Sequence, residues 1–290
     1  MYLINSKEKI GKLEFAGLAV KPNAPHLDIH CQRVEKKLNS LGIKLLTPMI
    51  MSEDEMFEKS DFLISIGGDG TLIAIARRSF KYQKPILGIH AGTLGFLTDI
   101  LLDEMEDFID KIVEDTYRID NRMVLDIELI SKNKNIKLVA FNDLVLTRPS
   151  VDSIINIDAF ANSKSSKMQD KHINRYYGDG LIVSTPTGST AYNLSAGGPI
   201  IYPLTRAMIL TPICPHSLTQ KPIVLPDDFE VSLTSEDHAY IVIDGQEKYD
   251  FNNFTSVKIK IAKDPIRLIH RNERSYFDVI KQKLNWGSNR

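Results

Sequence analysis

Asp69 is an acidic residue set among glycines in the stretch SIGGDGTL, Ser65–Leu72. The stretch joins an apolar run, FLISI, to a segment with helical spacing, TLIAIARRS, whose helix we expect to begin at Thr71. Glycines at a strand-to-helix turn let backbone N–H groups approach a phosphate, and the helix N-terminus favours an anion. A carboxylate repels phosphate, so Asp69 is useful in a phosphate site only if it acts on a group next to the phosphate. It can accept the proton of a hydroxyl that attacks phosphorus, or hold Mg²⁺.

The loop differs from both common phosphate-binding patterns, because it is neither a Walker loop nor a G-x-G-x-x-G fingerprint. Under the phosphate interpretation, Gly67, Gly68, Gly70 and Thr71 contact phosphate and Asp69 is catalytic. The simpler alternative is that Asp69 caps the following helix or closes a turn, since Asp between glycines is common in turns. The pentapeptide alone leaves both interpretations open.

Asn142 and Asp143 form a polar pair within the alternating stretch LVAFNDLVLT, which we predict to be one strand. Buried polar groups need partners, so this pair must find hydrogen bonds or face a ligand. Adjacent residues of a strand point to opposite faces, so the two can hold one ligand only near a strand end or bulge. A β-bulge or an edge pair is the alternative.

The segment Tyr176–Pro199 is the richest in chemistry-bearing residues. Gly178-Asp179-Gly180 predicts a turn with a second isolated acid, and LIVST predicts a strand after it. PTGSTAY then offers an aromatic residue, Tyr192, that can stack on a base, and hydroxyls that can bind an adenine edge or phosphates. These hydroxyls belong to Thr187, Ser189, Thr190 and Ser195. The alternative is a surface turn rich in Ser and Thr.

The surrounding elements predict a chain with an α/β part and an all-β part. Strand-like FAGLAV, FLISI and PILGI alternate with helical patterns at Asp28–Leu41, after Gly70 and at DEMEDFIDKIVED. This order predicts a parallel, helix-flanked sheet with ligands beyond the carboxyl ends of its strands. After about residue 117, period-two stretches such as RMVLDIELI, INIDAFA, FEVSLTS, AYIVIDG and SVKIKIA predict a layered, sandwich-like antiparallel domain. A last helical segment, SYFDVIKQKLNW, is expected to return to the first domain.

The composition is that of an ordinary globular chain of 290 residues with a net charge of −1, which favours neither nucleic-acid nor membrane partners. We expect KNKNIK and NSKSSKMQDK to be solvated turns. Two cysteines, Cys31 and Cys214, are too few for a disulfide scaffold or a zinc site, so we expect a reduced, cytoplasmic protein. The seven histidines show no metal-ligand spacing, and His90 and His216 lie nearest to the loops described above.

Taken together, the motifs resemble those of the bacterial NAD kinase family. They are GGDGT at Gly67–Thr71, GTLGFLTD at Gly92–Asp99, NDLVL at Asn142–Leu146 and the long segment Gly178–Pro199. The resemblance covers most of the chain, and the last motif is the most specific. GGDGT alone is shared with diacylglycerol and sphingoid lipid kinases, so a lipid kinase is one alternative. A non-catalytic NAD(P) sensor is another.

The resemblance implies a Rossmann-like N-terminal domain (1–117), a β domain (118–266) and a C-terminal segment (267–290) that packs back on the first. It implies transfer of the γ-phosphoryl group of ATP, or of polyphosphate, to the 2′-hydroxyl of the adenosine ribose of NAD. A divalent cation, Mg²⁺ or Mn²⁺, would be bound mainly through the ATP phosphates rather than by protein ligands. Assembly as a homodimer or homotetramer is typical of the family.

The resemblance also implies roles for individual residues. The position matching Asp69 is the proposed general base, and Asn142 and Asp143 match positions that hold the adenosine of NAD. Asp179 matches a residue that reaches the nicotinamide riboside, often of a neighbouring subunit. The remaining expected NAD contacts are Thr187, Ser189, Thr190, Ala191, Tyr192, Asn193, Leu194, Ser195 and Gln246.

Two departures from the family pattern concern charge. The family usually has Glu where this chain has Asp143; the shorter acid could reach ribose hydroxyls after a small backbone shift or through water. Some members have Arg directly before the GDG turn, where this chain has Tyr177. The sequence therefore does not identify the positive charge near the nicotinamide end.

Overall fold

A computed structural model describes residues 4–5, 8–21, 24, 27–92, 95–163 and 165–287. The chain divides into two compact units. The first unit consists of Met1–Asn121 and Ile266–Arg290, and the second is Arg122–Pro265. Thr93 and Leu94, within the predicted GTLGFLTD motif, lie outside the described residues.

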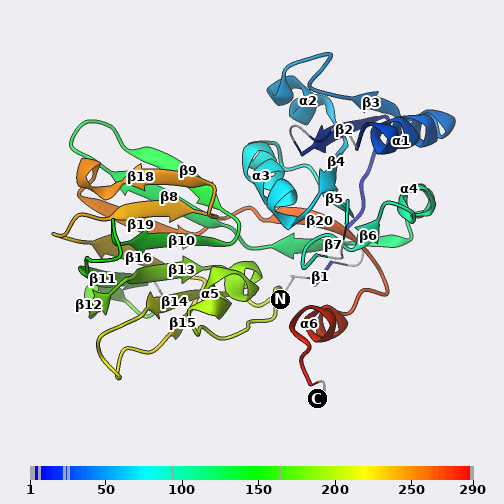
Figure 1. Ribbon diagram of the computed structural model, residues 1–290. Coiled ribbons are helices and arrows are strands. Elements are labelled where there is room, and N and C mark those ends of the chain that lie inside the picture. The colour runs from blue at the N-terminus through cyan, green and yellow to red at the C-terminus, as the bar shows by residue number, and fades with distance from the viewer. Residues whose placement is uncertain are drawn as a thin grey trace. The chain divides into compact units, whose positions relative to one another are not determined.

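The first unit is built on a mixed sheet, drawn in Figure 1, with the strand order β1-β7-β20-β5-β4-β2-β3 and with β6 paired to β5. Its strands are β1 (Ile4–Asn5), β2 (Phe15–Val20), β3 (Lys44–Leu46), β4 (Phe62–Gly67), β5 (Ile86–His90), β6 (Ile100–Leu101), β7 (Tyr117–Arg122) and β20 (Ile266–Arg271). The neighbours β2, β4 and β5 are parallel, as the alternating strand and helix patterns predict. Gly67 pairs with His90 in the register of β4 and β5, so GGDG and the loop after His90 leave the sheet at one edge.

Helices flank this sheet (Figure 1). They are α1 (Asp28–Ser40), α2 (Glu53–Lys59), α3 (Asp69–Ser79), the 3₁₀ turn η2 (Phe80–Tyr82), α4 (Met105–Val113) and α6 (Tyr276–Leu284). Val34 and Leu38 of α1 share one buried cluster with Ile64 and Ile66 of β4, and the apolar face of α4 belongs to the same cluster. Ile64 and Ile66 lie on one face of the sheet because side chains alternate between the faces of a strand. The predicted helix at Asp28–Leu41 is confirmed, and Gly42 follows it with φ +76°, the left-handed conformation that ends many helices.

The end of the chain returns to the first unit, as predicted, but it does so first through a strand. β20 inserts between β7 and β5 and pairs in parallel with β5, so that Leu268 lies opposite Ile86. The helix α6 follows, and Ser275 caps it by accepting a hydrogen bond from the Asp278 backbone N–H. The sequence prediction included the helix and missed the strand.

The second unit contains two antiparallel sheets, each with six strands among the described residues. One has the order β15-β14-β13-β10-β17-β18 and the other β12-β11-β16-β19-β8-β9. The strands are β8 (Leu125–Ile130), β9 (Ile136–Ala140), β10 (Asp143–Thr147), β11 (Ile155–Ser163), β12 (Met168–Gly178), β13 (Gly180–Ser184), β14 (Ala207–Ile213), β15 (Ile223–Pro226), β16 (Phe229–Thr234), β17 (Tyr240–Ile243), β18 (Glu247–Asp250) and β19 (Ser256–Ile261). Short helices are η3 (Thr187–Thr190), α5 (Tyr192–Ser195) and η4 (Phe251–Asn253). One core joins side chains of both sheets, such as Leu144 and Ile259, which confirms the predicted layered β domain.

Two predictions for this unit were wrong. LVAFNDLVLT is two strands, β9 and β10, separated at Phe141 and Asn142. NSKSSKMQDK contains the first residues of β12 as well as a turn. β12 is a long edge strand, and Met168–His172 are all exposed, so backbone pairing with β11 determines it more than any apolar alternation.

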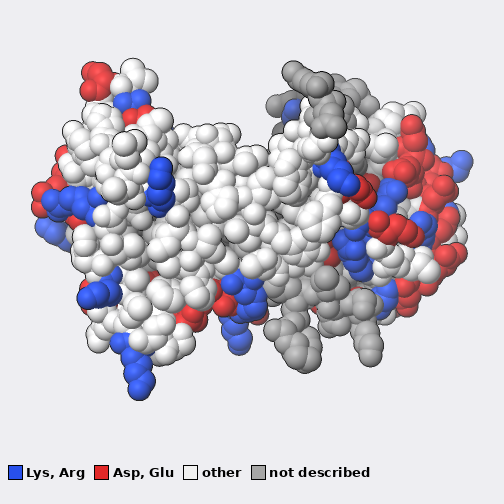
Figure 2. All heavy atoms as spheres, turned by 90° about the horizontal axis from the view of Figure 1, so that it is seen from below, with Lys and Arg blue, Asp and Glu red and all other residues white. Residues whose placement is uncertain are grey.

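The charged side chains are of both signs over the face shown in Figure 2, where Asp and Glu gather toward one end and Lys and Arg lie singly or in small groups. Within the described part of the chain, the structure contains no helix of the length and apolar character needed to cross a membrane.

Candidate functional site

Asp69 is the first residue of α3, and its carboxylate binds a loop that follows β5. Oδ2 accepts a hydrogen bond from the Phe96 N–H at 2.7 Å. Oδ1 accepts from the Leu97 and Thr98 N–H groups, both at 3.2 Å, and from Thr98 Oγ1 at 3.1 Å. Asp69 therefore holds the loop 96–98 rather than capping its own helix, and among the described residues Oδ2 accepts fewer hydrogen bonds than its lone pairs allow.

The GGDG turn differs from its prediction in two respects. The helix begins at Asp69, two residues before Thr71, with Gly68 as its N-cap. Gly67, Gly68 and Gly70 are outside the left-handed region, so this turn does not require glycine for its backbone angles. Close approach is the physical reason at Gly67, where a Cβ would lie 2.5 Å from Thr71 Oγ1.

A cavity of about 400 Å³ adjoins the N-terminus of α3. Two basic side chains, Lys21 at the end of β2 and Arg78 of α3, line it together with Gly68, Gly70 and Thr71. His90 ends β5 opposite Gly67, and burial is the main cause that lowers the pKa of its imidazole. Of the predicted phosphate-contacting residues, Gly68, Gly70 and Thr71 thus share a cavity with two basic side chains, whereas Gly67 is not part of its lining.

A second cavity, of about 420 Å³, lies within the second unit. Its lining combines the predicted polar pair with the predicted aromatic residue and the turn between β17 and β18. The lining residues are Asn142, Asp143, Val145, Thr147, Ala191, Tyr192, Val242, Asp244 and Gly245. The structure thus brings the separate motifs NDLVL and PTGSTAY to one site.

The turn at Asp244 and Gly245 fixes the backbone of the polar pair. Both residues have positive φ, 50° and 66°, as in the type I′ hairpin turns that favour Asp-Gly. The Asp244 carboxylate accepts hydrogen bonds from the N–H groups of Phe141, Asn142 and Asp143 at 2.7–3.0 Å. These bonds occupy the gap between β9 and β10, so Asn142 and Asp143 lie at a strand end, where both can contact one ligand.

Asp143 is 4% exposed and lies near the Asp244 carboxylate. Burial, and secondarily the charge of Asp244, raise the pKa of Asp143 to about 7. Near neutral pH its carboxyl group therefore exists in both forms, as a hydrogen-bond donor and as an acceptor.

Asp179 is paired with a cation that the sequence analysis missed. Arg148 Nη2 lies 3.0 Å from Asp179 Oδ2, and the Arg148 N–H donates to the Asp179 carbonyl at 3.0 Å. Arg148 Nη1 also donates to the carbonyls of Val151 and Ser153. Arg148 directly follows Thr147, which lines the second cavity, but neither Arg148 nor Asp179 is itself among the lining residues.

The residues of the PTGSTAY segment divide by environment. Ser189 and Asn193 are buried, and protein groups satisfy their side chains: Ser189 binds Ile201, and Asn193 binds Ser189, Pro199 and Thr211. The structure places both in the interior rather than on the cavity wall. Tyr192, in contrast, is 46% exposed and faces the cavity, with Ala191 beside it.

The other predicted contacts lie near the same segment without lining the cavity. Thr187 is buried, and its Oγ1 has no hydrogen-bond partner among the described residues. Thr190 donates from Oγ1 to the Thr187 carbonyl at 3.4 Å, Leu194 is half-buried, and Ser195 is exposed. Gln246 is exposed in the turn after β17, where its N–H donates to the Ile243 carbonyl at 2.9 Å.

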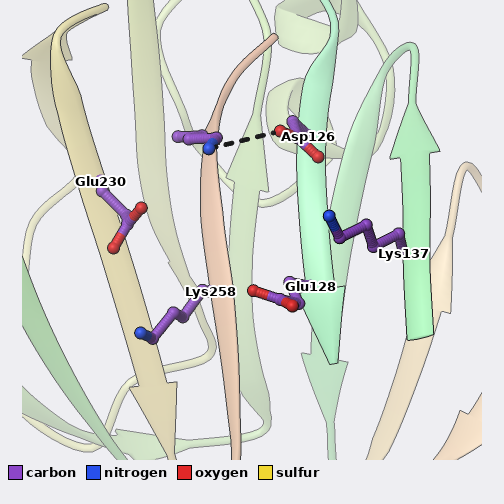
Figure 3. A pocket seen from close by; sticks show the side chains of 6 residues that line it. Asp126, Glu128, Lys137, Glu230 and Lys258 are labelled. Atoms are coloured by element: carbon purple, nitrogen blue, oxygen red, sulfur yellow. Dashed lines mark ion pairs between the residues drawn. The ribbon is translucent and has the colours of Figure 1, made fainter. Parts of the chain in front are cut away.

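A small charged pocket of about 60 Å³ lies apart from these residues, on strands β8, β9, β16 and β19 (Figure 3). Its side chains form cross-strand neighbours of opposite sign. The registered pairs are Glu230 with Lys260, Lys260 with Asp126, Lys258 with Glu128, and Glu128 with Lys137. Alternating charges of this kind stabilise a solvated sheet face, so we interpret the pocket as structural.

Comparisons with known proteins identify the family. Sequence models of the ATP-NAD kinase N-terminal and C-terminal domains match residues 27–117 and 141–271. The chain is 49% identical over 281 residues to a NAD kinase of Sulfurimonas denitrificans, covering 93% of this chain and 96% of the relative. It is 43% identical over 291 residues to a NAD kinase of Wolinella succinogenes, with 97% and 98% covered.

Solved structures agree with these sequence relatives. A yeast NADH kinase complexed with NADH has the same fold, with a TM-score of 0.85 at 24% identity over 97% of this chain and 90% of that chain. A NAD kinase from Archaeoglobus fulgidus in complex with ATP gives a TM-score of 0.77 at 26% identity over 93% and 98%. By its sequence relatives and by its fold, this chain belongs to the NAD kinase family of phosphotransferases.

Proposed function

We propose that this chain transfers the γ-phosphoryl group of ATP to the 2′-hydroxyl of the adenosine ribose of NAD and so makes NADP. The cavity of about 420 Å³ in the second unit is the observation that carries the proposal. It gathers Asn142, Asp143 and Tyr192, which match the family's adenosine-binding positions, and its volume is in the usual range for small-molecule sites.

The acceptor is held by complementary chemistry in this cavity. The exposed ring of Tyr192 offers a stacking face for adenine. The Asn142 amide and the Asp143 carboxyl offer donors and acceptors to the ribose hydroxyls or to the adenine edge. We assign the Arg148 guanidinium, which Asp179 pairs and orients, to the nicotinamide end in place of the arginine absent before GDG.

Asp69 accepts the proton of the 2′-hydroxyl as the bond to phosphorus forms. Its Oδ2 atom suits this role, because within the described residues it accepts one hydrogen bond whereas Oδ1 accepts three. The loop 96–98 fixes the carboxylate, and positioning supplies a large part of the rate in phosphoryl transfer.

The donor phosphates bind in the cavity at the N-terminus of α3. Lys21 supplies positive charge there, Arg78 adds a guanidinium that also pairs with Glu53 at 2.9 Å, and the helix N-terminus adds a favourable dipole. The ATP complex of the archaeal relative supports a nucleoside triphosphate as donor. The described residues contain no cluster of three or more His, Cys, Asp or Glu side chains suited to a metal ion. We propose that the divalent cation arrives with ATP and neutralises its phosphates, as Mg²⁺ commonly does in phosphoryl-transfer enzymes.

A coupled assay tests this function. NAD, ATP and Mg²⁺ are incubated with the protein, and NADP is detected with an NADP-specific dehydrogenase. Parallel reactions replace ATP with polyphosphate, or replace NAD with diacylglycerol or a sphingoid base. NADP formation that depends on protein and cation supports the proposal. NAD binding in calorimetry without NADP formation would indicate a sensor, and lipid phosphorylation alone would indicate a lipid kinase.

The assembly and the compartment are also part of the proposal. Homodimers or homotetramers are typical of the family, and sedimentation equilibrium of the purified protein measures the subunit number. Cys31 and Cys214 are both free thiols, which suits a reducing compartment such as the cytoplasm.

A further inference from the structure

The peptide group between Phe96 and Leu97 is held at both ends by charged side chains. Its N–H, from Leu97, donates to Asp69 Oδ1 at 3.2 Å. Its carbonyl, from Phe96, accepts a hydrogen bond from Arg274 Nη2. The peptide is trans, so its N–H and C=O point in opposite directions, and Asp69 and Arg274 lie at opposite ends of one planar group.

Arg274 is itself fixed by a buried network in the turn between β20 and α6. Its side chain is 5% exposed, and Nε lies 3.7 Å from Asp99 Oδ2. Its Nη1 lies 2.7 Å from both ring nitrogens of His270. The His270 ring is fully buried, and its Nδ1 lies 3.0 Å from Asp99 Oδ1.

Asp99 supplies the negative charge of this network. Burial by itself raises the pKa of Asp99, but His270 and Arg274 outweigh burial and lower that pKa to about 2. Asp99 is therefore a carboxylate at neutral pH and holds the guanidinium of Arg274 against the loop 96–98. The network belongs entirely to the first unit and lies outside the residues assigned to substrate.

Hydrogen bonds at the two ends of one peptide group strengthen each other, because each polarises the group in the same sense. A cation at the carbonyl makes the N–H a stronger donor to the carboxylate at the other end. We propose that Arg274 is a positioning residue for Asp69 and acts through the Phe96–Leu97 peptide. This inference rests on the proposed role of Asp69 as proton acceptor.

Arg274→Met tests the proposal by removing the cation at the Phe96 carbonyl. We expect kcat to fall by about 10- to 100-fold, in the range caused by small misplacement of a catalytic group. The KM values for NAD and ATP should stay within about twofold, because Arg274 contacts neither proposed substrate cavity. Arg274→Lys, which restores a cation, should recover most of the lost kcat.

Arg271→Met is the matched control. Arg271 comes from the same segment and is partly buried, and its Nη2 donates to the Asp99 carbonyl at 3.0 Å and pairs with Glu104 at 2.7 Å. It does not bind the Phe96–Leu97 peptide, so its kcat should stay within about twofold of the wild type. An equal loss in both variants would mean that general loosening of the turn matters, and would overturn the proposal.

A double-mutant cycle separates positioning from a purely structural role. In an Asp69→Asn background, Arg274→Met should cause little further loss, because the group it positions is already inactive. Additive losses, or unchanged kcat in Arg274→Met alone, would overturn the inference. If Arg274→Met does not fold, Arg274→Gln serves in the same cycle. Failure of the wild-type protein to make NADP would instead refute the proposed function.

Discussion

Asp69 and Asp244 perform the same structural task in different units. Each carboxylate accepts hydrogen bonds from three consecutive backbone N–H groups, of residues 96–98 for Asp69 and of residues 141–143 for Asp244. Backbone N–H groups outside regular pairing need acceptors, and a carboxylate is a strong one. Asp244 also lines the cavity of about 420 Å³, and Asp69 is the residue that we propose as proton acceptor.

The first prediction concerns the chemistry of Asp69. Asp69→Asn keeps one carbonyl oxygen for the hydrogen bonds of residues 97 and 98 but removes the proton acceptor. We expect kcat to fall by roughly 10²–10⁴, the usual range for general-base catalysis, with NAD affinity changed by less than about tenfold. Steady-state kinetics and calorimetry of NAD binding measure the two quantities. Turnover close to wild type would exclude Asp69 from the mechanism.

The second prediction concerns pH and Asp143, whose pKa is raised from 3.8 to about 7 in the folded protein. As pH rises from about 4 to 7, the unfolded chain loses a proton that the native state retains. The native state therefore loses stability across this window, by up to about 4 kcal/mol for a shift of roughly three pKa units. Below pH 4 the carboxyl is protonated in both states and this loss is absent.

Asp143→Asn removes the titration while keeping the shape of the side chain. The free energy of unfolding, measured by urea denaturation without NAD, should fall more steeply between pH 5 and pH 7 in the wild type than in the variant. The difference between the two profiles cancels groups that titrate alike in both proteins. Parallel profiles would show that Asp143 is ionised in the native state throughout this range.

Elements with a buried face were the ones that sequence patterns predicted well. β2, β4, β5, α1 and α4 each have the expected apolar spacing, and the structure confirms them. Elements that depend on distant partners were missed. β12 is an exposed edge strand paired to β11, and β20 pairs with β5, about 180 residues earlier in the chain. Local periodicity contains no information on such pairings.

The sequence shows the two glycines of the GDG turn but not the packing that requires them. β12 and β13 belong to different sheets, and the chain passes from one to the other at Asp179. A Cβ on Gly178 would lie 2.8 Å from the Ile213 and Cys214 carbonyl oxygens, and one on Gly180 would lie 2.4 Å from the Leu146 carbonyl oxygen. Both glycines are required because neighbouring backbone leaves no room for a side chain.

Gly180→Ala tests this constraint. The two nearest atoms that its Cβ would meet, the Leu146 carbonyl oxygen and the Thr147 Cα, belong to the backbone of β10 and cannot rotate away, so β13 and β10 must separate. We expect the free energy of unfolding to fall by about 1–3 kcal/mol, as for other overpacked sites. The control is Gly11→Ala, since a Cβ at Gly11 meets nothing within 4 Å. Equal stability of the two variants in urea would contradict the explanation.

At the scale of the whole molecule, the sequence singled out the candidate site residues but not the residues that hold them in place. Asp69, Asn142, Asp143 and Tyr192 were identifiable because glycines, polar pairs and aromatics stood out from their local pattern. Arg148 and the network of His270 and Arg274 were not identifiable, because only the folded chain brings them to Asp179 and to Phe96. The sequence does contain a signal for the turn at Asp244, because an Asp-Gly pair between two strand-like stretches is typical of a hairpin turn.

The two units have separate cores, which leads to the last prediction. The buried cluster of the second unit is drawn wholly from residues between Leu125 and Ile259. The first unit has its own cluster, to which β20 contributes Ile269. The ends of the second unit lie together, because Ile261 pairs with Leu125 and the Ala262 N–H donates to the Val124 carbonyl. A chain with its own core and adjacent ends has the properties of an independently folding domain.

We therefore expect residues 122–265, expressed alone, to fold and to bind adenosine nucleotides through the cavity at Asn142 and Tyr192. The fragment should form no NADP with ATP and Mg²⁺, because it lacks Asp69 and the cavity of Lys21. Circular dichroism with a cooperative urea transition tests folding, and calorimetry with NAD tests binding. Tyr192→Ala in the fragment should weaken binding by the loss of base stacking, about 1–3 kcal/mol where measured for nucleic-acid bases. A folded fragment that binds NAD equally well with and without Tyr192 would show that adenine is recognised elsewhere.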